Sequence, residues 1–319
     1  MKTYNIVDHN GYGTMHKLIS NLENNFENQY LLTLSNCIQE NKEKTEYFNK
    51  IVNEKNRLIC IHSSGSKSGI ILDNYGKIFG NAKNVVIFLH VSYDYLILKK
   101  KKKFLDNLSE LCEKYNILII VPSKEVMQQY KSKGFNCKVL QMGIPDIQKK
   151  KFYFESHDYL KKYYNKIITT CCSSKEIYQH VKGIDLFSQL INKNNLNDKA
   201  LIAGIDLENK IIDSKKFTED EFLNILCHSK MYVQLSRYES YNITACQAKR
   251  FKVPTILLNT EGTPSCMLNN VFNNLEEIEE LIVRNDLDSL KTEELYNDSL
   301  IRESLSNFNE NLESLFKGE

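Results

Sequence analysis

The stretch that decides the fold is Met231–Ser265, MYVQLSRYESYNITACQAKRFKVPTILLNTEGTPS. Met231–Leu235 is a short apolar run typical of a strand, and the polar residues after it show no helical period. Asn242 is a good N-cap for the helix that follows. The apolar residues of that helix are Ala245, Ala248 and Phe251. Pro254 then opens a second apolar run, which ends in a turn with the sequence EGTP.

Strand, loop, helix and strand in this order predict a parallel βαβ unit. The loops of such a unit lie at the carboxyl end of the sheet, where open α/β folds bind ligands. A helix N-terminus at this edge offers N–H groups to a phosphate. The stretch therefore predicts the outline of a site for a nucleoside diphosphate.

The rest of the chain repeats this alternation of short apolar runs and helical patterns. Such alternation predicts parallel strands with covering helices, and hence a doubly wound α/β architecture. The runs that we expect to be strands are 4–7, 58–62, 85–90, 117–121, 138–142, 167–171, 201–203, 231–235 and 255–258. Around Pro145 the composition shifts to mixed charge and aromatics without a clear period, which indicates an interdomain linker.

Length and composition bound the class of protein. A chain of 319 residues is too long for one ordinary core and suits two domains. We expect one at 1–148 and a second at 149–286, followed by a helical segment at 287–319. A hydrophobic content of 42% with 26% charged residues excludes wholesale disorder. The net charge of +2 excludes a generally basic nucleic-acid binder.

Cysteine usage and hydropathy indicate the compartment. The 9 cysteines show no CxxC pair or metal-ligand spacing, so we expect reduced and mostly buried thiols, including the pair Cys171-Cys172. The N-terminus lacks an uninterrupted apolar region, and no apolar run reaches the roughly 18 residues that a membrane span needs. We therefore expect a cytoplasmic protein that meets a membrane only from one side.

Two segments carry a family resemblance: SRYESYNITACQA at 236–248 and VPTILLNTEGTPS at 253–265. They resemble the donor-site signature of retaining GT-B glycosyltransferases of family four, the "group 1" transferases. Glu239 matches the first acid of that signature, and Gln247 stands where the second acid is expected. Upstream, Lys182-Gly183-Ile184-Asp185 resembles the family's Lys-Gly segment. The resemblance implies two Rossmann-like domains facing a cleft, with the acceptor on the N-terminal domain, the nucleotide sugar on the C-terminal domain, and a last helix packing back on the first domain.

The resemblance also implies a role for each matching side chain. Glu239 would hydrogen-bond hydroxyls of the donor sugar, Gln247 would contact the ribose, and Lys182 would neutralise the departing diphosphate. The family has an arginine six positions before that lysine, where this chain has Glu176, so Lys175 is the candidate replacement. Further donor contacts are expected from the backbone of Ser240, Tyr241 and Asn242.

Three candidates lie in the first half. The glycine turn with Gly11 and Gly13 follows a strand-like start and could approach a phosphate closely. His90 ends the VVIFLH run, and the family commonly has a histidine at this strand end, near the reacting face of the sugar. His62 is a weaker candidate for an acceptor loop. Plain structural alternatives stay open for all these residues: an ordinary turn, a packed histidine, a solvated acid or lysine.

Five consecutive lysines, Lys99, Lys100, Lys101, Lys102 and Lys103, precede the helical segment FLDNLSELCEKY. Like charges at a helix start oppose the helix dipole and repel one another, unless an anion offsets them. The anion could be an acidic lipid surface or a phosphate backbone. We favour the membrane because membrane-bound acceptors are common among the enzymes that this chain resembles.

These observations predict a metal-independent retaining glycosyltransferase that uses a UDP-sugar as substrate and has no cofactor and no metal site. No Asp-x-Asp motif stands at a strand end, so cations and helix termini would stabilise the leaving diphosphate. The expected acceptor is a lipid-linked cell-envelope glycan, with modified DNA or a protein hydroxyl as alternatives. Two rival classes stay open: a GT-B-shaped binding subunit without catalysis, motivated by Gln247, Ser265 and the missing arginine, and a nucleotide-sugar epimerase.

Overall fold

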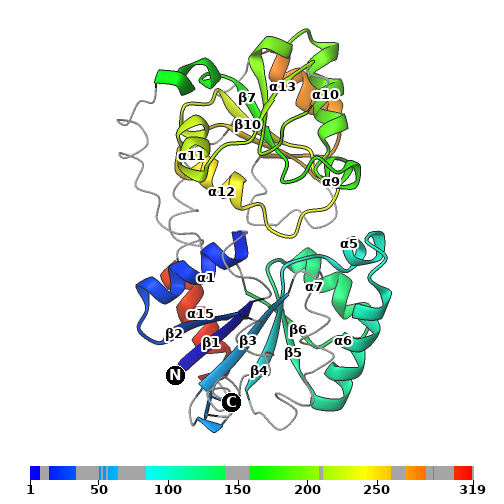
Figure 1. The fold of residues 1–319 in the computed structure, drawn as a ribbon. Coiled ribbons are helices and arrows are strands. Elements are labelled where there is room, and N and C mark those ends of the chain that lie inside the picture. Colours follow the sequence, from blue (N-terminus) through cyan, green and yellow to red (C-terminus); the bar gives the residue numbers. More distant parts are fainter. Residues whose placement is uncertain are drawn as a thin grey trace. The chain divides into compact units, whose positions relative to one another are not determined.

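The computed structural model describes residues 1–7, 14–33, 50, 51, 53, 54, 57–63, 84–140, 158–207, 211–259, 270–284, 290 and 305–317. The chain divides into two compact units. The first unit consists of Met1–Pro145 together with Leu305–Glu319, and the second of Asp146–Ser304. Figure 1 shows both units as α/β layers. The C-terminal helix therefore belongs to the first unit, although the whole second unit separates it from that unit in the sequence.

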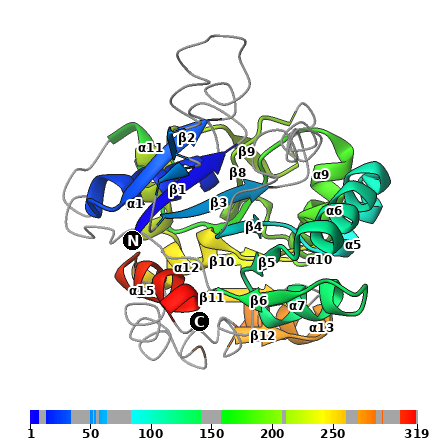
Figure 2. The ribbon, with the colours of Figure 1, turned by 90° about the horizontal axis from the view of Figure 1, so that it is seen from below.

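The first unit contains a parallel sheet of six described strands in the order β2-β1-β3-β4-β5-β6 (Figure 2). Its strands are β1 (Lys2–Val7), β2 (Gln29–Thr33), β3 (Arg57–Ser63), β4 (Val85–Leu89), β5 (Leu118–Val121) and β6 (Cys137–Val139). Its described helices are α1 (Thr14–Asn25), α5 (Tyr93–Leu98), α6 (Lys102–Tyr115), α7 (Lys124–Lys131) and α15 (Leu305–Lys317).

The central strands of this sheet are buried on both faces. Every residue of β3 and β4 is buried, as expected for parallel strands with helices on either side. Helices α5, α6 and α7 contribute Leu96, Leu105 and Val126 to the core cluster on one face. On the other face, Phe308 of α15 packs near Phe88 of β4, with ring centroids 6.2 Å apart. The C-terminal helix thus covers part of the sheet.

The second unit contains another parallel sheet of six described strands, in the order β12-β11-β10-β7-β8-β9. Its strands are β7 (Ile167–Thr170), β8 (Ala200–Ala203), β9 (Asp213–Lys215), β10 (Met231–Gln234), β11 (Thr255–Leu258) and β12 (Val271–Phe272). Its described helices are α9 (Glu176–Val181), α10 (Ile184–Lys193), α11 (Glu219–Cys227), α12 (Ile243–Arg250) and α13 (Leu275–Arg284), with short 3-10 turns η1 (Asp158–Tyr163) and η2 (Asn197–Lys199).

The second sheet has a core cluster and covering helices on each of its faces, as in a doubly wound fold, because neighbouring residues of one strand pack into different clusters. Ile167 of β7 joins a cluster with residues of α10 and α13, such as Phe187 and Ile278. The next residue, Ile168, joins a second cluster with Ile225 of α11 and residues of η1. This follows from the period of two along a strand, which sends successive side chains to opposite faces.

The predicted α/β fold class is confirmed, since the structure has two parallel sheets with covering helices. Each of the nine apolar runs expected to be a strand overlaps one, although the run expected at 138–142 is a strand only up to Val139 and its last two residues lie outside the described residues. The sequence interpretation missed β2, β9 and β12, all of which lie at sheet edges. The expected linker around Pro145 and the EGTP turn lie outside the described residues. Among the described helices, none is long and apolar enough to cross a membrane. The described cysteines are free thiols; Cys171 is buried as expected, whereas Cys172 is exposed, so the expected burial of this pair was wrong for Cys172.

Candidate functional site

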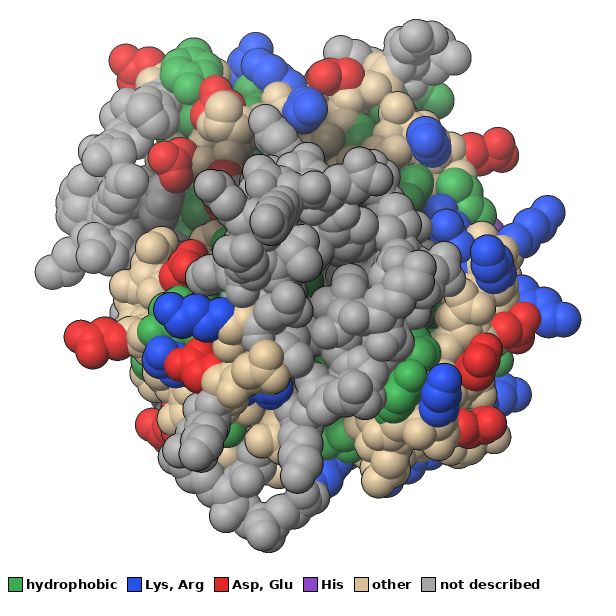
Figure 3. Space-filling model, turned by 60° about the horizontal axis from the view of Figure 1, so that its bottom comes forward, with side chains coloured by type: hydrophobic (Ala, Val, Ile, Leu, Met, Phe, Trp, Pro, Cys, Tyr) green, Lys and Arg blue, Asp and Glu red, His purple; other side chains and the backbone are tan. Residues whose placement is uncertain are grey.

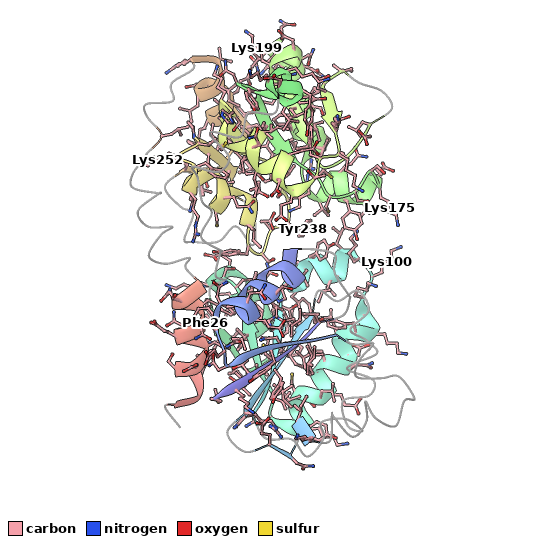
Figure 4. The ribbon with its side chains drawn as sticks, turned by 60° about the vertical axis from the view of Figure 1, so that its left-hand side comes forward. Phe26, Lys100, Lys175, Lys199, Tyr238 and Lys252 are labelled. Carbon is pink, nitrogen blue, oxygen red and sulfur yellow. The ribbon has the colours of Figure 1, made fainter. Side chains whose placement is uncertain are left out.

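The sheet of the second unit has a topological switch point between β7 and β10. Counted along the chain, its strands lie in the spatial order 3-2-1-4-5-6, so the connections after β7 and β10 run in opposite directions. Ligands of open α/β sheets bind beside the carboxyl ends of the two strands at such a point. Figure 4 shows the labelled Lys175 and Tyr238, which follow β7 and β10, at one end of the unit, and Lys199, which precedes β8, at the other.

The connections after β7 and β10 lie in close contact at a glycine. Gly183, at the junction of α9 and α10, has a φ of 66°, and a Cβ atom there would lie 1.8 Å from the carbonyl oxygen of Leu235. Only glycine fits so close an approach in this left-handed conformation. Next to it, the backbone N–H of Arg237 donates to the carbonyl of Val181 at 2.9 Å. The loop after β10 is therefore held against the end of α9.

This contact brings Lys182 and Glu239 together, the two side chains predicted to bind the donor. Lys182 Nζ donates to Glu239 Oε2 at 2.5 Å, and the two side chains are 26% and 12% exposed. Ser236 Oγ donates to the same carboxylate oxygen at 3.4 Å. Burial by itself lowers the pKa of Lys182, but the charge and the hydrogen bond of Glu239 outweigh it, so the pKa lies above its usual value. Lys182 therefore stays a cation.

A buried polar cluster supports the backbone of Lys182. Gln234 Nε2 donates to the carbonyl of Lys182 at 2.9 Å, and Gln234 Oε1 accepts from Tyr232 at 2.6 Å and from Thr170 at 3.0 Å. Burial is the main cause that raises the pKa of Tyr232 to about 12, so its hydroxyl stays protonated and can donate. These three residues were not among the sequence candidates. The sequence could have indicated them, because polar side chains at alternate positions of a buried strand need hydrogen-bond partners.

Arg237, a basic residue of the loop after β10, pairs with a different carboxylate. Arg237 forms two hydrogen bonds of 2.7 Å with the carboxylate of Asp185, and it donates to the carbonyl of His180 at 2.8 Å. This bidentate pair satisfies much of the guanidinium and links the loop after β10 to α10. Of the two basic side chains at the junction, Lys182 is the one that lies beside Glu239.

The remaining donor-site candidates of this loop serve partly as structure. Asn242 caps α12 as predicted, because its side chain accepts from the N–H of Ala245 at 3.0 Å. The side chain of Tyr241 is buried, so only its backbone can serve a ligand. Ser240 and Gln247 are half-buried, the latter in the second turn of α12.

Lys175 lies apart from the ion pair. It is exposed at the N-cap of α9, whereas Lys182 is the C-cap of the same helix. Seven residues of helix correspond to about 10 Å, at 1.5 Å per residue. The structure therefore does not bring Lys175 to Lys182 and Glu239, and its role at the diphosphate stays a prediction.

In the first unit, His90 follows β4 directly, and its backbone N–H donates to the carbonyl of Ser63 at 2.9 Å. Its ring contacts His62, with His62 Nδ1 and His90 Nε2 2.9 Å apart. Burial lowers the pKa of His90 to about 3, and burial together with His90 lowers the pKa of His62 well below its usual value. Both rings are therefore neutral near pH 7. The glycine turn with Gly11 and Gly13 lies outside the described residues.

The lysine run forms a turn and a helix start. Lys99 ends α5, Lys100 has a φ of 55°, and Lys101 is the N-cap of α6 without a side-chain capping bond. Lys102 and Lys103 are the first residues of that helix and are exposed. On the face that Figure 3 shows, basic and acidic side chains are intermixed over much of the described surface. Only two of the five lysines thus oppose the dipole from within the helix.

The comparisons with known proteins bear on the fold. No family model and no curated protein sequence matches the chain. A solved trehalose-6-phosphate synthase, described as an enzyme of glycosyltransfer with retention, matches with a TM-score of 0.65 at 11% identity over 100% of this chain and 99% of its own. The UDP-forming trehalose-phosphate synthase of Burkholderia xenovorans, solved with glucose-6-phosphate, gives 0.66 at 9% identity over 98% and 99%.

A third match is a TarM mutant from S. aureus, solved with fondaparinux, alpha-GlcNAc-glycerol and UDP. Its TM-score is 0.58 at 18% identity, and the match covers 85% of this chain and 58% of TarM. The chain has the GT-B fold. At these identities the matches speak for the fold alone, so the chemistry rests on the chain's own residues.

Proposed function

We propose that this protein is a retaining glycosyltransferase of the family-four type, which moves a sugar from a nucleoside diphosphate, UDP, to a hydroxyl acceptor. The observation that carries the proposal is the ion pair of Lys182 and Glu239. It places one cation and one carboxylate at the switch point of the sheet, next to the N-terminus of α12. The solved structures with the same fold include transferases bound to UDP or to a sugar phosphate, which supports this choice.

Lys182 suits the diphosphate. An ammonium group has three N–H donors, and Glu239 takes one of them, which leaves two for phosphate oxygens. Charge-assisted hydrogen bonds of this kind stabilise the negative charge that develops on a leaving phosphate. The partial positive charge at the N-terminus of α12 acts in the same direction. With this cation in place, the proposed reaction needs no metal ion, and a chelator should leave the rate unchanged.

Glu239 suits the sugar. An ionised carboxylate only accepts hydrogen bonds, and sugar hydroxyls donate them. In the proposed reaction the bond between C1 of the sugar and the phosphate oxygen breaks, and a bond from C1 to the acceptor oxygen forms on the same face. The acceptor proton passes to the leaving phosphate oxygen. Glu239 positions the ring, and neither it nor Lys182 becomes covalently attached.

For the acceptor we propose a lipid-linked glycan at an anionic membrane surface, in cell-envelope synthesis at the cytoplasmic face. Lys100, Lys102 and Lys103 are exposed, and Ile97, whose carbonyl accepts from the backbone N–H of Lys100, is an apolar side chain that is 50% exposed. Each basic residue near an anionic leaflet contributes about 1 kcal/mol of binding free energy. An exposed apolar side chain in the same turn as Lys100 fits the lipid boundary.

A second candidate is a protein that binds nucleotide sugars without turnover. The pairing of Arg237 with Asp185 favours this candidate. Because Arg237 is engaged there, Lys182 is the cation beside Glu239 that would have to neutralise both phosphates of the leaving group. The two candidates differ in product. A transferase hydrolyses its donor slowly when the acceptor is absent, whereas a binding protein leaves the donor intact.

The test is incubation with a panel of nucleoside-diphosphate sugars, followed by measurement of free nucleoside diphosphate. The wild type is compared with Lys182→Ala and with Lys193→Ala, a control that loses a lysine from another Lys–Glu pair of the same unit. The proposal expects release from a UDP-sugar by the wild type and the control and its loss in Lys182→Ala. Binding of a donor without release would favour the second candidate, and neither binding nor release would overturn both.

A further inference from the structure

A chain of buried polar side chains crosses the sheet of the first unit and connects His90 with α15. It runs from His90, after β4, to His62 of β3, Asn5 of β1, Gln29 of β2 and Asn309 of α15. The four successive distances are 2.9, 3.0, 2.8 and 2.7 Å. Asn5, Gln29 and His62 are at most 2% exposed. Placing so many polar groups in a core is costly unless each one is satisfied.

All these side chains lie on the sheet face that α15 covers. Partners in parallel register share a face, and so do residues two apart on one strand. The register pairs Thr3 with Gln29, Asn5 with Cys60 and His62 with Phe88, which puts Asn5, Gln29, His62 and Phe88 on the same face. Phe88 packs near Phe308 of α15, and its ring stacks on that of His90 with centroids 4.4 Å apart. Asn28 adds a second link to this helix through a 2.6 Å hydrogen bond to Glu313.

The hydrogen bonds of this chain have one direction. An amide oxygen only accepts and an amide nitrogen only donates. Asn309 Oδ1 accepts from Gln29 Nε2, and Gln29 Oε1 accepts from Asn5 Nδ2. Asn5 Oδ1 faces His62 Nε2, so that nitrogen must carry a proton.

The direction then fixes both histidine rings. Burial keeps His62 neutral, so its Nδ1 has no proton and accepts from His90 Nε2. His90 is neutral too, and with its proton on Nε2 the lone pair lies on Nδ1. Neighbouring hydrogen bonds select the tautomer of a histidine in the same way in metal and catalytic sites.

We propose that the chain from α15 through Gln29, Asn5 and His62 holds His90 as a neutral ring whose Nδ1 is a hydrogen-bond acceptor. Gln29, Asn5 and His62 are thus positioning residues. The consequence for substrate binding rests on the proposed function. A nitrogen that accepts hydrogen bonds suits a hydroxyl group of the sugar or of the acceptor, and it repels a phosphate oxygen. His90 would then favour a hydroxyl group over a phosphate group as its ligand.

The ring states are measurable without any substrate, by ¹⁵N NMR of protein labelled at histidine. His62→Gln and His90→Gln assign the two signals. In the wild type near pH 7 we expect both rings neutral and protonated at Nε2. A charged ring at either position, or a proton on His90 Nδ1, would overturn the proposal whatever the protein catalyses.

Asn5→Leu tests the coupling, because it removes the acceptor for His62 Nε2. The His62 proton should move to Nδ1, which then donates to His90 Nε2 and shifts the His90 proton to Nδ1. The matched control is Cys60→Ala, since Cys60 is buried and is the register partner of Asn5. Unchanged rings in a folded Asn5→Leu variant would contradict the coupling. If that variant does not fold, the wild-type spectrum decides, because the chain permits only one ring state.

A kinetic cycle tests the consequence for turnover. Asn5→Leu should lower the rate about tenfold to a hundredfold in the wild type, since it misorients a substrate contact. In a His90→Ala background the same change should have no further effect. Equal losses in both backgrounds would assign Asn5 a merely structural role. The absence of any transfer activity would instead count against the proposed function and leave the ring states to the NMR result.

Discussion

The ion pair at the switch point makes a counterintuitive prediction: Glu239→Gln should bind free UDP more tightly than the wild type while it loses turnover. In the unliganded protein Glu239 already neutralises Lys182, at 2.5 Å. A diphosphate that approaches this lysine meets a carboxylate of the same sign as itself. The glutamine keeps the shape and one hydrogen-bonding oxygen but removes the charge.

The size of the effect follows from the geometry of the pair. A hydrogen bond to a charged group contributes about 1.5 to 3 kcal/mol, and both partners are largely buried. In the wild type, UDP binding has to weaken this hydrogen bond, and in Glu239→Gln that free-energy cost is removed. If half or more of the stabilisation is involved, the Kd for UDP falls by roughly tenfold, because about 1.4 kcal/mol corresponds to a factor of ten. Turnover of a UDP-sugar should fall by at least about a hundredfold, because the sugar loses an oriented acceptor.

Calorimetric titration of UDP at fixed salt measures the first effect, and single-turnover release of UDP measures the second. Glu279→Gln is the matched control, because it removes the same charge from the Lys193 pair between α10 and α13. Circular dichroism confirms that each variant is folded. Weaker or unchanged UDP binding in a folded Glu239→Gln protein, at the level of the control, would refute the assignment of Lys182 to the diphosphate.

Three further predictions concern other parts of the chain. Gly183→Ala should destabilise the second unit by about 2 to 4 kcal/mol in urea unfolding, because its Cβ would meet the Leu235 carbonyl, and a change below about 0.5 kcal/mol would contradict the close approach. The stability of the first unit should fall as the pH drops below about 6.5, because the unfolded rings of His62 and His90 bind protons that the folded rings exclude. Each ring should contribute up to about 1.4 kcal/mol per pH unit, in the case of His90 down to a pH of about 3, and a urea midpoint that is constant from pH 7 to 5 would oppose this. Replacing all of Lys99–Lys103 by glutamine should abolish salt-sensitive co-sedimentation with anionic vesicles, with neutral vesicles and duplex DNA as comparisons, and equal sedimentation of both proteins would remove the membrane role.

The sequence was sufficient to predict the central parts of both sheets. Strands such as Val85–Leu89 are buried on both faces, so they read as continuous apolar runs with one interpretation. The edge strands Asp213–Lys215 and Val271–Phe272 were missed because they are only three and two residues long, and the first contains no apolar residue. Their pairing depends on the neighbouring strand, which local sequence does not contain.

The candidate site divides in a similar way. Lys182 and Glu239 could be predicted, because each stands in a local motif and both motifs follow strands that meet at the switch point. Lys175 was a candidate because it is close to Lys182 in the sequence, but a helix of about one and a half turns separates the two residues in space. The hydrogen-bond chain from Asn309 to His90 could not be predicted, because it depends on the register of four strands and on a helix near the far end of the sequence.

The central claim is that Lys182 and Glu239 hold the diphosphate and the sugar of the donor. Its most direct test is a crystal structure of the protein with UDP. The account predicts a phosphate oxygen within about 3 Å of Lys182 Nζ, at the N-terminus of α12, with the ribose on the side of Gln247. A diphosphate bound elsewhere, with the pair of Lys182 and Glu239 intact and untouched by the ligand, would contradict it.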